Sequence, residues 1–366
     1  MKTFLCETCQ NEVYFENSTC LGCQSAVGFD AALLSMITLQ PAGEGVFQRV
    51  REPDASFRYC GNAAHGVCNW LTDTTKLDGL CDACELNRTI PNLIESGSLD
   101  AWRQLEFAKK RLVYSLLSLG LPLQLEGEHA RRLTFDFLRE ATTGHKDGVI
   151  TVDITEADPV ERERVRLRFE EPYRTLLGHL RHESGHFYWL VLVEDQGRLD
   201  EFRSVFGDES QDYAEALARH YRDGPPQDWQ MSHVSAYASA HPWEDWAETW
   251  AQYLHIVDSL DTSEAVGMEP RASRLVYGSS WPFQRYDIYR HGTLDELIDR
   301  WIPLALAVNN LSRSMGHPDF YPFIIPAGAR PKLDFIHRAV RGSAATTVAR
   351  QVPNATAAPH QTPGSS

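Results

Sequence analysis

All eight cysteines of this 366-residue chain lie within its first 84 residues, where they form four pairs. Three pairs are CxxC, and ten residues separate CETC from CLGC, a spacing typical of a zinc ribbon in which each knuckle supplies two thiolates to a tetrahedral site. Such a small unit depends on its metal for stability. The pairs are Cys6 with Cys9, Cys20 with Cys23, Cys60 with Cys68, and Cys81 with Cys84.

The first four cysteines predict one structural zinc site, and the last four predict a second. The second set contains one irregular pair, so His65 could replace Cys68 there. A disulfide framework is the alternative, but it requires a secreted chain. The start MKTFLCETCQ lacks the apolar core of a signal peptide, and no run approaches the ~18 to 20 apolar residues that span a bilayer. We therefore expect a reducing cytoplasm, no membrane partner, and zinc-bound thiolates.

A second feature is RHESGHFYW, residues 181–189, which places His182 and His186 four residues apart. On a helix these two imidazoles share a face and can bind one metal ion, while Glu183, about 100° around, addresses a metal-bound water. This is the HExxH pattern of zinc hydrolases. An accidental histidine pair on a surface helix is the alternative. The apolar flanks, Leu176, Leu177, Leu180, Phe187, Trp189 and Leu190, predict instead that the histidines face the interior.

A third feature is the helix expected after Pro242, in which Glu244 and Glu248 are again four residues apart. One carboxylate could be the third zinc ligand, and the other could accept a hydrogen bond from a ligand histidine. Sequence spacing leaves open which is which. Of two further histidines, His179 is expected to be a satisfied core or surface residue, and His241 is a candidate substrate contact.

The segments LLGHLRHESGH and AYASAHPWEDWAETWAQYLHI resemble the bacterial zinc-binding metallopeptidase family that carries an N-terminal zinc ribbon. HESGH, the following Glu-x-x-Ala-Glu helix, and a tyrosine seven residues before its first Glu are also similar to the gluzincin-type site of the anthrax lethal factor protease. This resemblance implies that Glu244 is the third ligand of a catalytic zinc and that Tyr237 stabilises the transition state. Glu248 is then the outer partner of a ligand histidine.

The expected function is therefore a zinc-dependent peptidase in which Glu183, as general base, takes a proton from the attacking water. Two alternatives stay open: a catalytically silent zinc-binding interaction or regulatory protein, and a zinc hydrolase of a non-peptide amide or ester. The expected partner is a protein or peptide substrate, whereas the oligomeric state is left open. Zinc ribbons often bind nucleic acid, but residues 1–85 hold five Lys or Arg against eleven Asp or Glu, so no basic surface is predicted.

The expected fold class is α+β, with one or two zinc-ribbon modules followed by a mostly helical zincin-like metallopeptidase domain that contains a small sheet. We predict a cysteine-rich region over residues 1–88, the peptidase domain over 89–340, and a disordered tail over 341–366, where large apolar residues become scarce. A helix is expected over residues 98–119, and a strand over 147–154. That strand lies either at the sheet edge beside the substrate or inside the sheet. Thr293 and Glu296 predict a capping box.

Overall fold

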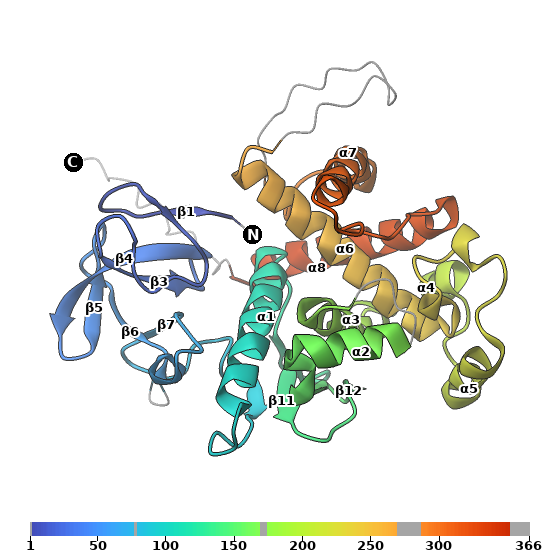
Figure 1. The fold of residues 1–366 in the computed structure, drawn as a ribbon, viewed down its shortest axis with the longest axis horizontal. Coiled ribbons are helices and arrows are strands. Elements are labelled where there is room, and N and C mark those ends of the chain that lie inside the picture. Colours follow the sequence, from blue (N-terminus) through green and yellow to red (C-terminus); the bar gives the residue numbers. More distant parts are fainter. Residues whose placement is uncertain (1, 77–78, 169–173, 269–286, 352–366) are drawn as a thin grey trace, which may run out of the picture.

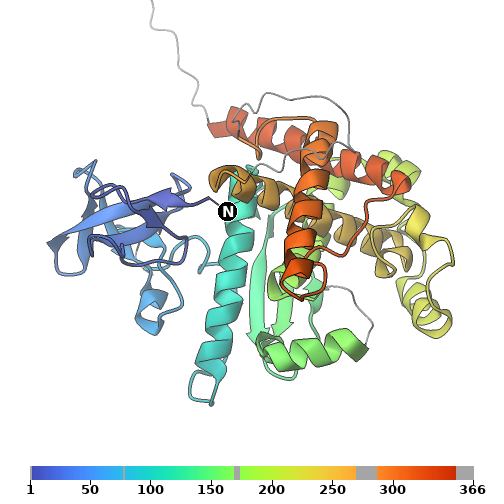
Figure 2. The same cartoon turned by 45° about the horizontal axis from the view of Figure 1, so that its top comes forward.

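The computed structural model describes residues 2–76, 79–168, 174–268 and 287–351. A strand-rich N-terminal region is followed by a largely helical region, and helix α1 (Ser98–Ser118) stands between the two in both views (Figures 1 and 2). The mixed architecture predicted from the sequence, with the cysteine-rich strands first and the helices second, is confirmed at this level.

The N-terminal region contains a small hairpin and a curled antiparallel sheet. The hairpin pairs β1 (Phe4–Leu5) with β2 (Glu12–Val13). The sheet has the order β3 (Ala26–Asp30), β4 (Ser35–Gly43), β5 (Val46–Arg49), β6 (Ser56–Tyr59) and β7 (Leu71–Asp73). The sheet curls so that its first strand, β3, also contacts its last strand, β7. The Phe29 amide of β3 donates to the carbonyl of Asn69, just before β7, at 3.1 Å. The buried rings of Phe29 and Trp70 then meet Tyr114 of α1 in one continuous core.

The second sheet belongs to both regions of the chain. Its order is β12 (Gly144–Lys146), β13 (Val149–Asp153), β11 (Thr134–Leu138) and β8 (Asn87–Thr89). Strands β8 and β13 are parallel to β11, and β12 is antiparallel to β13. The boundary predicted at residue 88 therefore falls inside β8, which the cysteine-rich region contributes to the next domain. A short hairpin pairs β9 (Gln124–Leu125) with β10 (Arg131–Arg132).

The strand predicted over residues 147–154 is β13, and it is internal, so of its two possible placements the one at the sheet edge was wrong. The alternation of Thr151 and Asp153 with Ile150 and Val152 predicts a strand but does not distinguish an edge strand from an internal one. The three-residue strand β12, GHK, gave too short a pattern to be recognised. Strand β12 takes the edge position beside β13.

The helical region contains α2 (Pro159–Arg168), α3 (Leu176–Trp189), α4 (Leu199–Phe206), α5 (Tyr213–Asp223), α6 (Pro242–Ala265), α7 (Leu294–Ser314) and α8 (Arg330–Gln351). The predicted capping box of α7 is present, since the side chain of Thr293 accepts from the Glu296 amide and that of Glu296 from the Thr293 amide. None of the described helices is both long and apolar enough to cross a membrane.

Helix α8 overlaps the tail predicted over residues 341–366. It begins at Arg330, buries Leu333, Phe335 and Ile336, and continues past residue 341 to Gln351. A helix already nucleated by buried residues extends at a lower free-energy cost than a new helix requires to form. The rest of the predicted tail, residues 352–366, lies outside the described residues.

Helices α3 and α6 pack closely because the variable positions of the HESGH motif are small. A Cβ atom on Gly185 would lie 2.9 Å from the Cα of Ala247 and 3.1 Å from Cδ1 of Trp250. The indole of Trp246 donates to the Gly185 carbonyl at 2.7 Å, and that of Trp250 donates to the Ser184 hydroxyl at 3.1 Å. These contacts fix the motif helix against the helix that carries Glu244 and Glu248.

We expect Gly185→Ala to lower the thermal unfolding midpoint. The new methyl group meets backbone that cannot move by itself, and overpacking of this kind costs about 1–3 kcal/mol, against a gain of about 1 kcal/mol in helix propensity. Gly43→Ala is the control, because its Cβ atom would have its nearest neighbour at 4.0 Å. Differential scanning calorimetry of both variants checks this, and equal midpoints would contradict the close packing.

Candidate metal centres and active site

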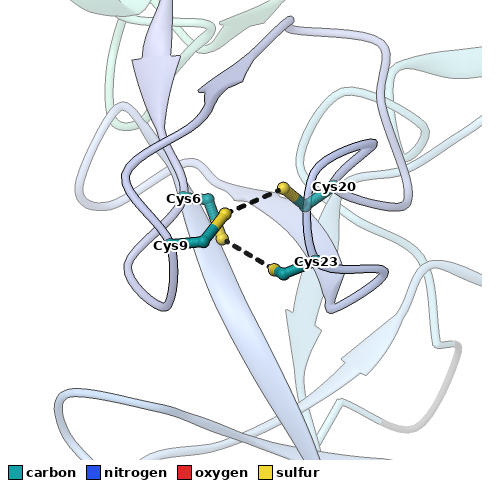
Figure 3. A group of neighbouring side chains, drawn as sticks. All are labelled: Cys6, Cys9, Cys20 and Cys23. Atoms are coloured by element: carbon teal, nitrogen blue, oxygen red, sulfur yellow. Dashed lines mark hydrogen bonds between the residues drawn. The ribbon is translucent and has the colours of Figure 1, made fainter.

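Cys6, Cys9, Cys20 and Cys23 form the first cysteine centre, in which two loops point their thiols at one point (Figure 3). The Sγ atoms of Cys6 and Cys23 are 3.6 Å apart, as are those of Cys9 and Cys20. Zinc–sulfur bonds of about 2.3 Å in a tetrahedron place the sulfurs about 3.8 Å apart. A disulfide requires about 2.05 Å, and all eight cysteines are free. The spacing thus fits a zinc ion.

The backbone turns that build this centre repeat after each CxxC. Gln10 and Gln24, which follow Cys9 and Cys23, both have φ of 62°. Their amides donate to the carbonyls of Cys6 and Cys20 at 2.9 Å. This left-handed residue closes each loop so that both of its thiols face inward.

Cys60, Cys68, Cys81 and Cys84 form the second centre, in which every cysteine is buried. The Sγ atom of Cys68 lies 3.7 Å from those of Cys81 and Cys84, again a tetrahedral spacing. The amide of Cys81 points at the sulfur of Cys60 at 3.4 Å. His65, the alternative to Cys68, is exposed, and its ring lies against Trp102. The structure therefore groups the four cysteines and leaves His65 out.

The second centre is joined to α1 by buried charges. Lys110 Nζ donates to the carbonyl of Val67, next to Cys68, at 2.8 Å and to Glu106 Oε2 at 2.7 Å. Lys109 contacts the other oxygen of Glu106 at 2.8 Å, and all three side chains are almost fully buried. A four-thiolate zinc site has a net negative charge, so a buried ammonium group beside it lowers the cost of burying that charge.

The third group of converging side chains joins the HESGH helix to α6. His182, His186 and Glu244 each offer one ligand atom, and these atoms lie within 4.8 Å of one another. Glu244 Oε2 is 3.1 Å from His182 Nε2, and Glu244 Oε1 is 3.8 Å from His186 Nε2. The side chain of Thr175 caps α3 by accepting from the Gly178 amide, and His241 and Pro242 begin α6.

This donor set fits a zinc ion. With zinc bonds of about 2.0 Å to nitrogen and oxygen, tetrahedral ligand atoms lie about 3.3 Å apart, close to the observed spacings. Glu244 Oε2 is buried and has no hydrogen-bond partner among the described residues, although it faces His182 Nε2. A group that binds both atoms at once, such as a metal ion, satisfies them.

Glu248 contacts the outer side of the same histidine. Its Oε1 lies 2.7 Å from His182 Nδ1, and its Oε2 accepts from the Ser235 hydroxyl at 2.6 Å. The two carboxylates left open by the spacing are thus separated by geometry: Glu244 meets the inner nitrogens of the histidines, and Glu248 meets the outer nitrogen of His182. An acceptor on Nδ1 fixes the proton there and directs Nε2 inward.

The electrostatics of this group depend on its burial. Although burial opposes it, contacts with Glu244 and Glu248 raise the pKa of His182 well above its usual value, so a metal ion that binds Nε2 displaces a proton from it. Burial lowers the pKa of His186 to about 3. Burial also raises the pKa of Glu183, which makes this carboxylate a stronger proton acceptor than an exposed glutamate.

Tyr237 lies beside the histidine pair, with its ring 6.0 Å from that of His182. It begins the short helical turn η5 (Tyr237–Ser239), which packs against α6. Burial raises the pKa of its phenol far above the usual range, so the hydroxyl remains a hydrogen-bond donor. Trp243 covers the other side, at 5.6 Å from the ring of His186.

His179 and His241 both have local partners. His179 Nδ1 lies 2.6 Å from Glu156 Oε2, and Glu156 also accepts from the Thr143 hydroxyl. This agrees with the expectation of a satisfied histidine. His241 caps α6, since its Nδ1 accepts from the Trp243 amide at 3.1 Å. That contact explains its position before Pro242 without a substrate.

Sequence reasoning missed Ser235 and Tyr213. Ser235 contacts Glu248, and Tyr213, at the start of α5, donates its hydroxyl to Glu244 Oε1 at 2.7 Å. Neither residue belongs to a spaced motif. Tyr213 lies 31 positions before Glu244 on a mostly exposed helix, so nothing in the chain marked it.

Two family models match the chain: one ends just before α1, and the other begins at the first residue of α1. The model described as "Putative zinc-binding metallo-peptidase" matches residues 98–339, and one described as a zinc-ribbon domain matches residues 3–95. The first span includes all the residues of the third group.

Full-length relatives extend the similarity over both parts. Uncharacterized proteins of two Mycobacterium tuberculosis strains and of Mycobacterium bovis are each 40% identical over 346 residues, which is 93% of this chain and 95% of theirs. No solved structure matches the chain. Because the peptidase model covers well over half of the chain, the protein belongs to this zinc-binding metallo-peptidase family and carries a zinc-ribbon domain at its N-terminal side.

Proposed function

We propose that this protein is a zinc-dependent peptidase of the HExxH gluzincin type. His182, His186 and Glu244 are its catalytic zinc ligands, Glu183 is its general base, and Tyr237 stabilises the transition state. The convergence of two imidazoles and one carboxylate within 4.8 Å carries this proposal, because such a set, with a further glutamate next to the first histidine, is the composition of a hydrolytic zinc site. The arrangement is also similar to that of the anthrax lethal factor protease.

The residues of the chain divide the reaction between them. A zinc ion bound here supplies a Lewis acid that activates water and polarises a carbonyl group. Glu183 accepts the proton of the attacking water and delivers it to the leaving amine. Tyr237 donates its hydroxyl to the oxygen that becomes negative as the carbonyl carbon turns tetrahedral. Glu248 holds His182 in the tautomer whose Nε2 has a free lone pair.

The same proposal includes the cellular location, the substrate class and the structural zinc ions. Free thiols at tetrahedral spacing favour zinc over disulfides and therefore a reducing, cytoplasmic location. The net charge of −15 disfavours nucleic acid, so we propose a protein or peptide substrate. The cysteine centres are structural, with one zinc ion each.

A peptide library tests the peptidase assignment, because it samples many sequences at once and requires no chosen substrate. Peptides derived from a bacterial proteome are incubated with the purified protein, and new termini are read by mass spectrometry. We expect cleavage that stops after mild chelation and returns with zinc. A zinc-loaded protein that cleaves no peptide would support instead a silent binding protein, and hydrolysis confined to small amides or esters would support a non-peptide hydrolase.

We expect about three zinc ions per chain, of which mild chelation removes one. The catalytic site keeps an open position through which a chelator can attack, whereas four-thiolate sites are closed. Elemental analysis before and after chelation, with thiol titration, measures both classes. Two zinc ions or fewer together with free reactive thiols at Cys60 to Cys84 would contradict a second structural site.

Tyr237→Phe should retain the removable zinc and lose activity by roughly 10- to 1,000-fold, the range for one oxyanion donor. The ring and its packing remain, so thermal stability should change little. Turnover of a cleaved library peptide measures the loss, with zinc content determined on the same sample. Wild-type turnover would remove the tyrosine from the mechanism.

A further inference from the structure

Tyr213 links an exposed helix to a buried carboxylate of the candidate active site. It is the first residue of α5, whose N-terminus is capped by the side chain of Asp212, and its side chain is 42% exposed. Its hydroxyl nevertheless reaches Glu244, which is 1% exposed, and donates to Oε1 at 2.7 Å. A surface tyrosine has no need of a buried anionic acceptor, since water satisfies its hydroxyl equally well.

This hydrogen bond distinguishes the two oxygens of Glu244. Oε1 is 2.7 Å from the Tyr213 hydroxyl and 3.8 Å from His186 Nε2. Oε2 is 3.1 Å from His182 Nε2 and has no hydrogen-bond partner among the described residues. Oε1 is therefore held by Tyr213 on the side of His186, and Oε2 faces His182 without a hydrogen-bond partner among the described residues.

The other candidate ligands are supported unequally. Glu248 holds His182 through Nδ1, in the same way that Tyr213 holds Glu244. Nδ1 of His186, by contrast, is buried without a hydrogen-bond partner in the part of the chain that the structure describes. Orientation of the set therefore depends on Glu248 and Tyr213.

We propose that Tyr213 is a positioning residue of the metal site, which holds Glu244 so that Oε2 is presented to the zinc ion. This inference rests on the proposed catalytic zinc site. A carboxylate ligand fixed by a hydrogen bond loses less freedom when the metal binds, and removal of such an outer contact typically costs about 10- to 100-fold in metal affinity. The Tyr213 hydroxyl also makes Oε1 the weaker metal donor of the two oxygens, because the hydrogen bond uses one of its lone pairs.

The same contact attaches α5 to the site. Ala216 is the one buried residue of α5, but two rings of this helix lie near the candidate active site. The ring of Tyr213 is 5.3 Å from that of His241, and the ring of His220 is 6.0 Å from that of Tyr237. Tyr221, one position after His220, is 63% exposed. It offers a matched control, a tyrosine on the same helix whose hydroxyl can be removed without touching Glu244.

The test compares Tyr213→Phe with Tyr221→Phe in the full-length protein. Mild chelation empties the removable site, and zinc is returned in competition with a chromophoric chelator to measure its dissociation constant. Cobalt(II) is then placed in the same site of each protein, where its visible spectrum reports the number and geometry of ligands. Neither measurement uses a substrate.

We expect the zinc dissociation constant of Tyr213→Phe to rise about 10- to 100-fold, with a changed cobalt spectrum, while Tyr221→Phe matches the wild type in both. Circular dichroism of the three proteins should agree, since each variant loses one hydroxyl and keeps its ring. Wild-type affinity and an unchanged spectrum in Tyr213→Phe would overturn this inference alone. A wild-type protein without removable zinc would overturn the proposed function, and the inference with it.

Discussion

Glu183→Gln is expected to keep its removable zinc and to lose roughly 10²- to 10⁴-fold in turnover, the contribution of a positioned general base. The amide has nearly the shape of the carboxylate but accepts no proton at neutral pH. Glu183 is not among the converging ligand atoms, so its replacement leaves His182, His186 and Glu244 intact. Burial raises the pKa of Glu183, and this strengthens its proton affinity in the wild-type protein.

The measurement pairs zinc content with the initial rate on a cleaved peptide. Glu128→Gln is the control, because Glu128 is an exposed glutamate on the loop between β9 and β10. It should retain full rate and full zinc. If Glu183→Gln retains the wild-type rate with its zinc in place, a different residue takes the proton or the activity belongs to a contaminant.

Glu244→Ala is expected to empty the removable site, whereas Glu248→Ala should weaken it by about 10- to 100-fold and recover when zinc is added. Glu244 faces both histidines, at 3.1 Å and 3.8 Å, so its loss removes a bond to the metal. Glu248 touches His182 at Nδ1, so its loss frees a ring that can still bind. Two carboxylates one helical turn apart therefore give effects of different size.

Zinc titration of the two variants decides between these roles, with the structural zinc ions as an internal reference for protein concentration. The cysteine centres should stay filled in both variants. If Glu248→Ala loses the zinc outright and Glu244→Ala recovers it, the two glutamates exchange roles. The assignment of Tyr237, which is counted from Glu244, would then lose its support.

Local spacing explains why so much of the three centres could be predicted from the sequence. A CxxC loop brings two thiols together by itself, and residues i and i+4 of a helix share a face wherever that helix lies. Pairs of this kind are Cys6 with Cys9, Cys20 with Cys23, His182 with His186, and Glu244 with Glu248. The helix over residues 98–119 and the capping box at Thr293 were found for the same reason, since their patterns are complete within a few turns.

Only the tertiary structure decided how these local units meet. The packing of loops and helices places Cys68 rather than His65 in the second cysteine centre. It also places Glu244 rather than Glu248 at the inner nitrogens of the two histidines. The pairing of β8 with β11 and the contact from Tyr213 to Glu244 join segments separated by tens of residues. Spacing along the chain determines which side chains share a face, whereas packing determines what that face meets, and long-range contacts leave no periodic signal in the sequence.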